Sequence, residues 1–194
     1  MNHLGPQSDE ELVLLAQKGS EVHFEALVDR HTPSVYRLAL GITGDRMEAE
    51  EVVQETFLRA FKHLGRFSPS KASFKTWLLA IARNQSINVF KSLKRKATRF
   101  LSDSDPDDHD PGPDNPFGPN CDNAETLLSI KQECALVEQA LGDLPERQRT
   151  ALLLKCEEQM SYEQIASVMD TSVSSVESLI FRARKKLLEI ADVS

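Results

Sequence analysis

Residues 161–186 read SYEQIASVMDTSVSSVESLIFRARKK, and their pattern predicts two short helices joined by a tight turn. Ser161 followed three residues later by Gln164 forms a capping-box pattern, which marks the start of the first helix. Asp170 falls at the turn, where a residue that tolerates left-handed backbone is favoured. Apolar residues recur at helical spacing on both sides of this turn, so each helix has a face to bury. The segment therefore predicts a helix-turn-helix, whose second helix is the one expected to enter a major groove.

Positive charge gathers at the end of this second helix, at Arg182, Arg184, Lys185 and Lys186. Basic residues placed there could contact phosphates and fix the register while outward side chains read bases. Basic residues also favour any helix C-terminus, and a generic helix hairpin would explain the apolar spacing alone. The cluster by itself leaves both interpretations open.

The composition of the 194-residue chain predicts one or two small all-α domains, because glycine is sparse and apolar residues recur at helical period. No apolar run approaches the roughly 18 residues of a membrane helix, so we expect no membrane insertion. The three cysteines, Cys121, Cys134 and Cys156, lack zinc-site spacing and are expected to be reduced thiols in a cytoplasmic protein. The sequence predicts no metal and no cofactor.

The net charge of −7 is unevenly distributed along the chain. Residues 1–96 carry 14 Lys and Arg against 11 Asp and Glu, whereas residues 97–125 carry one base and eight acids. Residues 126–194 carry eight bases against 11 acids. An acidic protein is a poor free-standing DNA binder, because non-specific affinity comes from phosphate neutralisation. Either the helix-turn-helix does not bind DNA, or a partner supplies much of the affinity.

Residues 97–125 divide the chain into two helical blocks. Their Asp, Pro, Gly, Ser and Asn content is too polar for a packed core, so they are expected to form a flexible acidic linker. In the block 1–96, Ser8 and Asp45 are expected to cap helices, and Pro33 is expected to break or restart one. The block 126–194 holds the helix-turn-helix. The expected fold is all-α, with an N-terminal helical bundle and a C-terminal helix-turn-helix bundle.

Charges in the first block are segregated by helix. The helix expected over 45–64 has an acidic and amide stripe, whereas the helix expected over 73–96 concentrates bases. A charged stripe is usually only a solvated face. Here the segregation suggests one basic partner and one polyanionic partner.

Four stretches together resemble the extracytoplasmic-function (ECF) class of the sigma-70 family, the bacterial transcription initiation factors. They are FEALVDRHTPSVYRLAL, AEEVVQETFLRAFKHLGRF, FKTWLLAIARNQSINVF, and LPERQRTALLLKCEEQMSYEQIASVMDTSVSSVESLIFRARKKL. They occur in the family's order with an acidic tether between them. The resemblance implies a domain of sigma region 2 over residues 1–96 and a domain of sigma region 4 over residues 126–194.

The resemblance also implies roles for individual residues. The surface that binds core polymerase would include Glu51, Gln54 and Glu55. The residues that read and melt the −10 element would be Phe74, Lys75, Asn84, Lys91, Lys94 and Arg95. The residues that read the −35 element would be Ser175, Glu177, Ser178, Phe181, Arg182, Arg184 and Lys185. Many members have a basic residue where Glu177 stands, and a glutamate accepts from cytosine but repels phosphate, so the resemblance leaves the −35 preference of this chain open.

The function implied is a sigma factor without catalytic residues, and not an enzyme. It would act in the cytoplasm, bind core RNA polymerase through the β′ clamp helices and the β flap, and recognise promoter DNA. An anti-sigma factor is a further implied partner. Two alternatives are a stand-alone helix-turn-helix regulator, which would footprint DNA without polymerase, and a sigma-like decoy, against which the basic helix end argues. The acidic linker is either a nucleic-acid mimic or a passive spacer.

Overall fold

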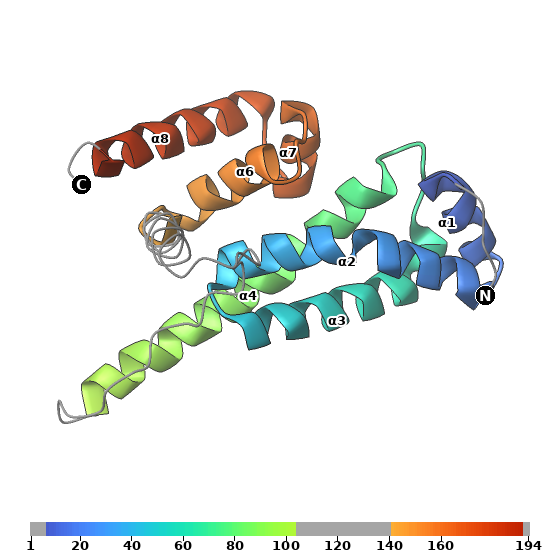
Figure 1. The fold of residues 1–194 in the computed structure, drawn as a ribbon, viewed down its shortest axis with the longest axis horizontal. Coiled ribbons are helices and arrows are strands. Elements are labelled where there is room, and N and C mark those ends of the chain that lie inside the picture. The colour runs from blue at the N-terminus through green and yellow to red at the C-terminus, as the bar shows by residue number, and fades with distance from the viewer. Residues whose placement is uncertain (1–6, 104–140, 192–194) are drawn as a thin grey trace, which may run out of the picture.

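The computed structural model describes residues 7–103 and 141–191, and these residues fold into helices with no strand (Figure 1). The expected all-α class is confirmed. The helices are α1 Asp9–Gln17, α2 Glu21–Thr43, α3 Arg46–His63, the 3-10 turn η1 Leu64–Arg66, α4 Phe74–Asp103, α6 Glu146–Cys156, α7 Tyr162–Met169 and α8 Val173–Ala191. None of the helices in these residues is long and apolar enough to cross a membrane.

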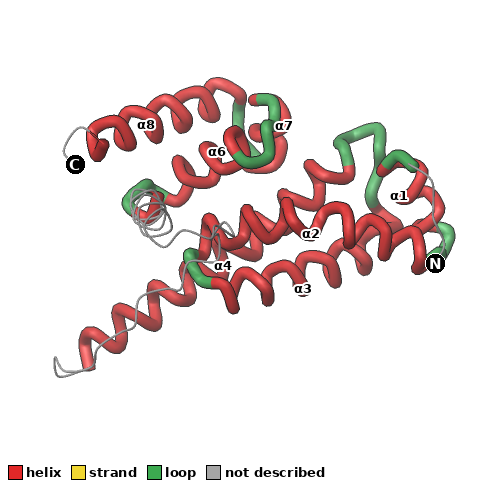
Figure 2. The backbone as a smooth tube through the Cα atoms, viewed as in Figure 1, coloured by secondary structure: helices red, strands yellow, loops and turns green. Residues whose placement is uncertain are grey.

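Helices α1 to α4 form an N-terminal lobe, and helices α6 to α8 form a C-terminal lobe. In the N-terminal lobe α2, α3 and α4 pack against one another, and α1 lies across one end of the group (Figure 1). The described connections within each lobe are short (Figure 2). The centre of the N-terminal lobe is filled by fully buried apolar side chains, among them Leu38, Ile42, Leu78 and Leu79.

Local capping rules set the helix ends where the sequence indicates them. Ser8 and Glu11 form a reciprocal capping box at the start of α1, and the Asp45 carboxylate accepts from the Glu48 amide at the start of α3. Between α2 and α3, Gly44 adopts a left-handed conformation with φ of 72°, which a glycine reaches without steric cost. Helices α2 and α3 therefore turn back on each other over two residues.

Pro33 does not break α2, so the expectation of a break there is wrong. The helix continues from Glu21 to Thr43 with Pro33 in its interior and exposed to solvent. The Thr32 hydroxyl donates to the Val28 carbonyl at 2.7 Å in the same turn. Packing of α2 against α1, α3, α4 and α6 outweighs the missing backbone donor.

The two lobes share one hydrophobic core. Helix α6 packs on α2 and α7 packs on α4, and a single cluster of buried residues runs from Leu12 to Ile180. At the contact between α2 and α6, a Cβ added to Gly41 would lie 2.6 Å from Leu153 Cδ1, so the absence of a side chain at Gly41 permits this close approach.

Helix α4 extends to Asp103, seven residues beyond the predicted end of the first domain at residue 96. The rest of the predicted linker, and the start of the second domain up to residue 140, lie outside the described residues.

Candidate nucleic-acid interface

Helices α7 and α8 form the predicted helix-turn-helix. The Ser161 hydroxyl accepts from the Gln164 amide at 3.3 Å, and the Gln164 side chain accepts from the Ser161 amide at 2.8 Å. Asp170 ends α7 in the left-handed region, with φ of 48° and ψ of 59°. The capping box and the left-handed turn predicted from the sequence are both confirmed. They bring α8 back across the lobe within three residues.

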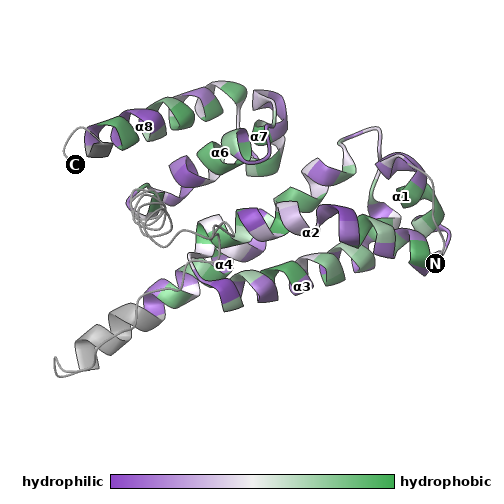
Figure 3. Ribbon diagram, in the orientation of Figure 1, coloured by the Kyte–Doolittle hydropathy of each residue, from purple (hydrophilic) through white to green (hydrophobic). Residues whose placement is uncertain are grey.

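The orientation of α8 is fixed by its buried face. Val176, Ile180 and Ala183 are buried against the rest of the C-terminal lobe, and Ile165 of α7 is fully buried beside them. Hydrophobic and hydrophilic residues alternate along α8 (Figure 3). Because one face is committed to the core, the opposite face is held outward by the fold.

The outward face of α8 combines an aromatic ring, an acid and a base. Glu177, Ser178, Phe181 and Arg182 line one open surface depression, and Phe181 is 70% exposed. An exposed ring suits contact with a thymine methyl group, and an arginine suits guanine or a phosphate. The four residues come from adjacent turns, so they can contact neighbouring base pairs.

The remaining residues expected at this face differ in their surroundings. Ser175 is half-buried, and the Ser178 hydroxyl donates to the Ser174 carbonyl at 3.0 Å. Arg184 and Lys185 are exposed, and Lys185 lies 3.8 Å from Glu189. Lys186 instead donates to the Asp143 carbonyl and so ties α8 to the start of the described C-terminal lobe. Of the basic cluster, Arg182, Arg184 and Lys185 remain exposed at the surface of α8.

Helix α4 presents a polar and basic row. Asn84, Asn88, Lys91 and Arg95 follow one another at intervals of three or four residues, and all four are exposed. The Asn84 side-chain oxygen accepts from Arg83 at 3.2 Å. Lys94 is exposed beside this row. The row holds three of the six residues expected at the −10 element, namely Asn84, Lys91 and Arg95, and Lys94 lies next to it.

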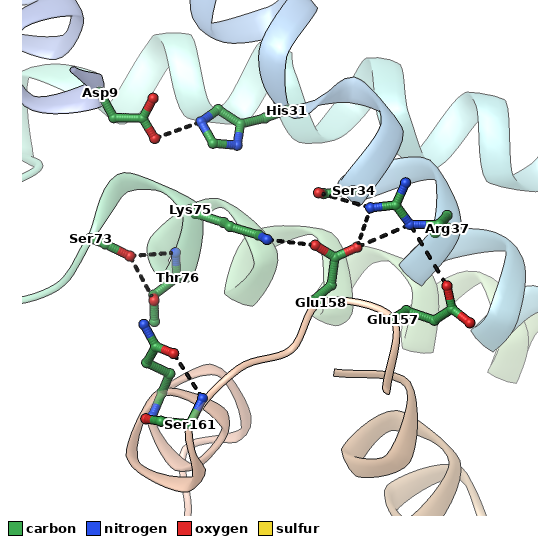
Figure 4. A network of polar contacts seen from close by, with 11 residues as sticks. Asp9, His31, Ser34, Arg37, Ser73, Lys75, Thr76, Glu157, Glu158 and Ser161 are labelled. Atoms are coloured by element: carbon green, nitrogen blue, oxygen red, sulfur yellow. Dashed lines mark hydrogen bonds and ion pairs between the residues drawn. The ribbon is translucent and has the colours of Figure 1, made fainter. Parts of the chain in front are cut away.

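Phe74 and Lys75 do not join this row. Phe74 is 2% exposed and packs against the rings of Phe67, Trp77 and His31. Lys75 points toward the C-terminal lobe, where it meets Glu158 (Figure 4). In this arrangement of the lobes Phe74 is closed to a base, whereas the Lys75 side chain is 35% exposed and its ammonium group is paired with Glu158.

The exposed face of α3 is partly apolar. Glu51 and Gln54 are exposed, and Glu55 pairs with Arg59 at 2.5 Å. The same helix also exposes three large apolar side chains that the sequence analysis did not select, Met47, Leu58 and Phe61. Together with Glu51 and Gln54 they are spaced by four, three, four and three residues, which places them on one face. That regular spacing is the signal that could have identified them.

An ionic cluster joins the lobes at Glu158, in the connection between α6 and α7 (Figure 4). Its side chain is 1% exposed and lies between cations of the other lobe. Arg37 of α2 donates to one carboxylate oxygen at 2.8 and 3.2 Å, and Lys75 Nζ lies 2.7 Å from the other oxygen. Burial would raise the pKa of the Glu158 carboxyl, but hydrogen bonding to Lys75, Ser34 and Arg37 outweighs it and holds the pKa below its ordinary value.

Two further contacts cross between α4 and α6. Arg83 lies 3.8 Å from Glu146, and the Arg149 guanidinium stands over the Phe90 ring, 4.8 Å from its centre. Among the described residues, no group of three or more His, Cys, Asp and Glu side chains could hold a metal ion.

Two of the candidate helices, α3 and α8, lie on different sides of the molecule. Helix α8 and helix α3 lie at opposite edges in Figure 1, with α2, α4 and α6 between them. A partner on α3 would therefore leave the outer face of α8 uncovered.

Comparison with known protein families agrees with this arrangement. The family model for sigma-70 region 2 matches residues 27–100, and the model for sigma-70 region 4 matches residues 134–187. The chain is 34% identical over 184 residues to the RNA polymerase sigma-H factor of Pseudomonas aeruginosa, covering 95% of this chain and 94% of that relative. It is 33% identical over 182 residues to the ECF RNA polymerase sigma-E factor of Escherichia coli, covering 93% and 92%.

Solved structures with a similar fold include a sigma factor. CnrH in complex with the cytosolic domain of CnrY has a TM-score of 0.72 and 26% identity, covering 97% of this chain and 99% of that chain. The sigma factor RpoE in complex with the anti-sigma factor NepR from Bartonella quintana has a TM-score of 0.63 and 25% identity, covering 88% and 98%. The chain therefore belongs to the sigma-70 family of RNA polymerase sigma factors, in its ECF class.

Proposed function

We propose that this chain binds core RNA polymerase and directs it to promoters that carry −10 and −35 elements. The observation that carries the proposal is the order of two helical lobes in one chain, each with an exposed polar helix face. Region 2 matches the lobe with α4, and region 4 matches the lobe with α8. The exposed row on α4 would read the −10 element, and the depression on α8 would read the −35 element.

Helix α3 is the proposed docking surface for polymerase. Glu51, Gln54 and Glu55 supply acceptors for a basic helical partner, and charge complementarity would steer the encounter. Leu58 and Phe61 add apolar area on the same helix. Polymerase binding would compensate for the weak DNA affinity expected of a chain with net charge −7.

An anti-sigma factor is the second proposed protein partner, since the similar structure of RpoE is of a complex with the anti-sigma factor NepR. Because core RNA polymerase acts in the cytoplasm, the proposal includes a cytoplasmic location for this protein. The chain carries no chemistry of its own in this proposal, because the polymerase supplies the catalytic centre. A stand-alone DNA-binding regulator is not favoured, because the family match covers the polymerase-binding region as well as the helix-turn-helix.

Run-off transcription with mapped 5′ ends tests the proposal. Purified core polymerase alone should start RNA synthesis without preference on a library of genomic fragments. Addition of this chain should concentrate starts at sites that share two upstream sequence elements. Unchanged start sites at saturating protein would refute the proposal, and a footprint by the protein without polymerase would favour the stand-alone regulator.

A further inference from the structure

The connection between α6 and α7 directs one of two adjacent acids into the molecule. Glu157 is 52% exposed, whereas the side chain of Glu158 is 1% exposed. Gln159, which follows, adopts a left-handed conformation with φ of 51°, an uncommon state for a residue with a side chain. The backbone there bends so that Glu158 faces the N-terminal lobe. The Glu157 carboxylate stays at the surface and comes no closer than 3.9 Å to Arg37 Nε.

The partners of Glu158 all belong to the other lobe. Arg37 comes from α2, where it also donates to the Ser34 hydroxyl, and Lys75 comes from the first turn of α4. A buried carboxylate is strongly unfavourable unless cations and donors surround it. Glu158 therefore stays buried only while the lobes are packed together, and separation would leave its carboxylate and both cations without these partners.

The same packing occupies cations of α4 with acids of the C-terminal lobe. Lys75 faces Glu158, and Arg83 lies 3.8 Å from Glu146 while its side chain is 14% exposed. Lys75 is also one of the residues expected to contact the −10 element. In the packed state its ammonium group lies 2.7 Å from the Glu158 carboxylate, so a DNA phosphate would have to displace that carboxylate, although the Lys75 side chain is 35% exposed.

Reading two promoter elements requires more separation than the packed lobes allow. This step rests on the proposed function. Helix α7 contacts both α4 and α8, and packed helices lie about 8–10 Å apart, so the two reading helices are about 20 Å apart at these contacts. Promoter elements about two helical turns apart are separated by roughly 70 Å. The packed state can engage one element but not both.

We propose that Glu158 is a latch that holds the two lobes together in the free protein and blocks Lys75 from DNA. Opening the latch separates the lobes and releases the basic side of α4. Core polymerase would stabilise the open state by binding both lobes. The free protein is then kept from DNA by its own C-terminal lobe, in addition to its net negative charge.

The lobe separation can be measured without polymerase or DNA. Spin labels at Asp29→Cys and Ser167→Cys, exposed positions on α2 and α7, report the distance between the lobes once Cys121, Cys134 and Cys156 are replaced by serine. Glu158→Gln should add a population at longer distances by double electron–electron resonance. Glu157→Gln, which removes the same charge from the adjacent exposed residue, should leave the wild-type distribution. Equal distributions for the two variants would overturn the latch.

A bulky substitution between the lobes, which changes no charge, is an independent test of the state with separated lobes. Phenylalanine at Gly41 would collide with Leu153 across the lobe boundary but would stand at the surface of α2 once the lobes separate. Gly41→Phe should therefore lengthen the same distance without altering Glu158.

DNA binding by the free protein tests the consequence. With a fluorescein-labelled promoter duplex, both Glu158→Gln and Gly41→Phe should bind about tenfold more tightly than wild type, because more of the protein is in the competent state. Glu157→Gln should stay within about twofold of wild type, as expected for one exposed charge. If the lobes separate in these variants but DNA affinity does not rise, then the proposal that the packed lobes block Lys75 from DNA is overturned. The distance measurement needs neither promoter nor polymerase. A negative result there would refute the latch, whereas a negative run-off transcription assay would refute the proposed function.

Discussion

At the scale of single residues, Arg182 is the clearest candidate for contact with the −35 element. It is exposed beside Phe181 on α8 and lines the depression with Glu177. Arg182→Ala should weaken the free energy of binding to the −35 element by about 1–3 kcal/mol, because the contact with a guanine is lost. Run-off transcription should fall on a template that depends on a −35 element and stay near wild type on one that does not. Arg66→Ala, at an exposed arginine of η1, is the control. Equal loss on both templates would remove Arg182 from the −35 site.

Asn84 is the residue on α4 proposed to hold an unstacked base. Its amide is exposed and its oxygen accepts only from the neighbouring Arg83 among the hydrogen bonds of the described residues. Asn84→Ala should slow promoter opening about tenfold, the value of one good hydrogen bond to a base, and leave closed-complex binding unchanged. Permanganate reactivity of the melted thymines follows opening over time. Asn88→Ala, one turn further along the same face, is the matched control, and equal slowing by both variants would argue against a specific role for Asn84.

The Asp9 carboxylate couples folding stability to pH. His31 Nε2 lies 2.7 Å from one carboxylate oxygen and Arg30 lies 2.6 Å from the other. The hydrogen bond from His31, with help from Arg30, holds the pKa of Asp9 below its ordinary value although burial opposes this. A carboxyl with a lowered pKa in the folded state adds stability above its unfolded pKa, and this contribution is lost as pH falls through the lowered pKa.

Asp9→Asn should therefore lower the free energy of unfolding by about 1 kcal/mol at pH 7, and the difference from wild type should narrow as pH falls below about 4. Urea unfolding at several pH values measures this. Glu10→Gln removes the same charge from an exposed residue in the same turn and should have a smaller effect at every pH. A deficit for Asp9→Asn that grows toward low pH would contradict the assignment.

The residues that could be predicted from the sequence are those whose structural role depends on near neighbours. Ser161, Gln164 and Asp170 act within one helical turn of themselves, so spacing alone indicates the capping box and the left-handed turn. Glu158 could not be identified in this way, because Arg37 lies 121 positions away in the sequence. Phe74 is expected at the −10 element from the resemblance, and only its packing shows that it is buried in this arrangement.

At the scale of helices, α3 is the element that should decide polymerase affinity. Gln54→Ala combined with Glu55→Lys should reduce co-purification with core polymerase by about tenfold or more, because a charge reversal at an interface adds repulsion as well as removing a contact. Folding should be intact, since the exposed pair with Arg59 contributes only about 0.3–0.5 kcal/mol. Glu25→Lys, an exposed charge reversal on α2, should have little effect. Co-purification equal to wild type would count against docking through α3.

Helix α2 shows why one element was predicted less well. Pro33 removes a backbone donor, and from the sequence alone this favours a break. The helix continues because both of its flanks are covered by other helices, which the sequence around Pro33 does not indicate. The apolar side chains on the outer face of α3 were missed for a related reason. Leu58 and Phe61 follow the core residues Phe57 and Ala60 directly in the sequence, so the two faces separate only when the spacing from Met47 is followed along the whole helix.

At the scale of the whole molecule, the sequence indicates two helical blocks but not how they meet. Composition identifies an acidic segment between helical patterns, and that is a local property. The shared core depends on the fit of α6 against α2 at Gly41 and of α7 against α4, which periodicity does not specify. Apolar periodicity shows that a face is buried, but it does not name the helix that covers it.

The central claim is that the two lobes are packed together in the free protein and separated when polymerase uses them to read two promoter elements. The distance between spin labels at Asp29→Cys and Ser167→Cys, measured with and without core polymerase, tests this claim most directly. The account predicts a single short distance in the free protein and a longer one in the polymerase complex. The same short distance in an active, promoter-bound complex would contradict it.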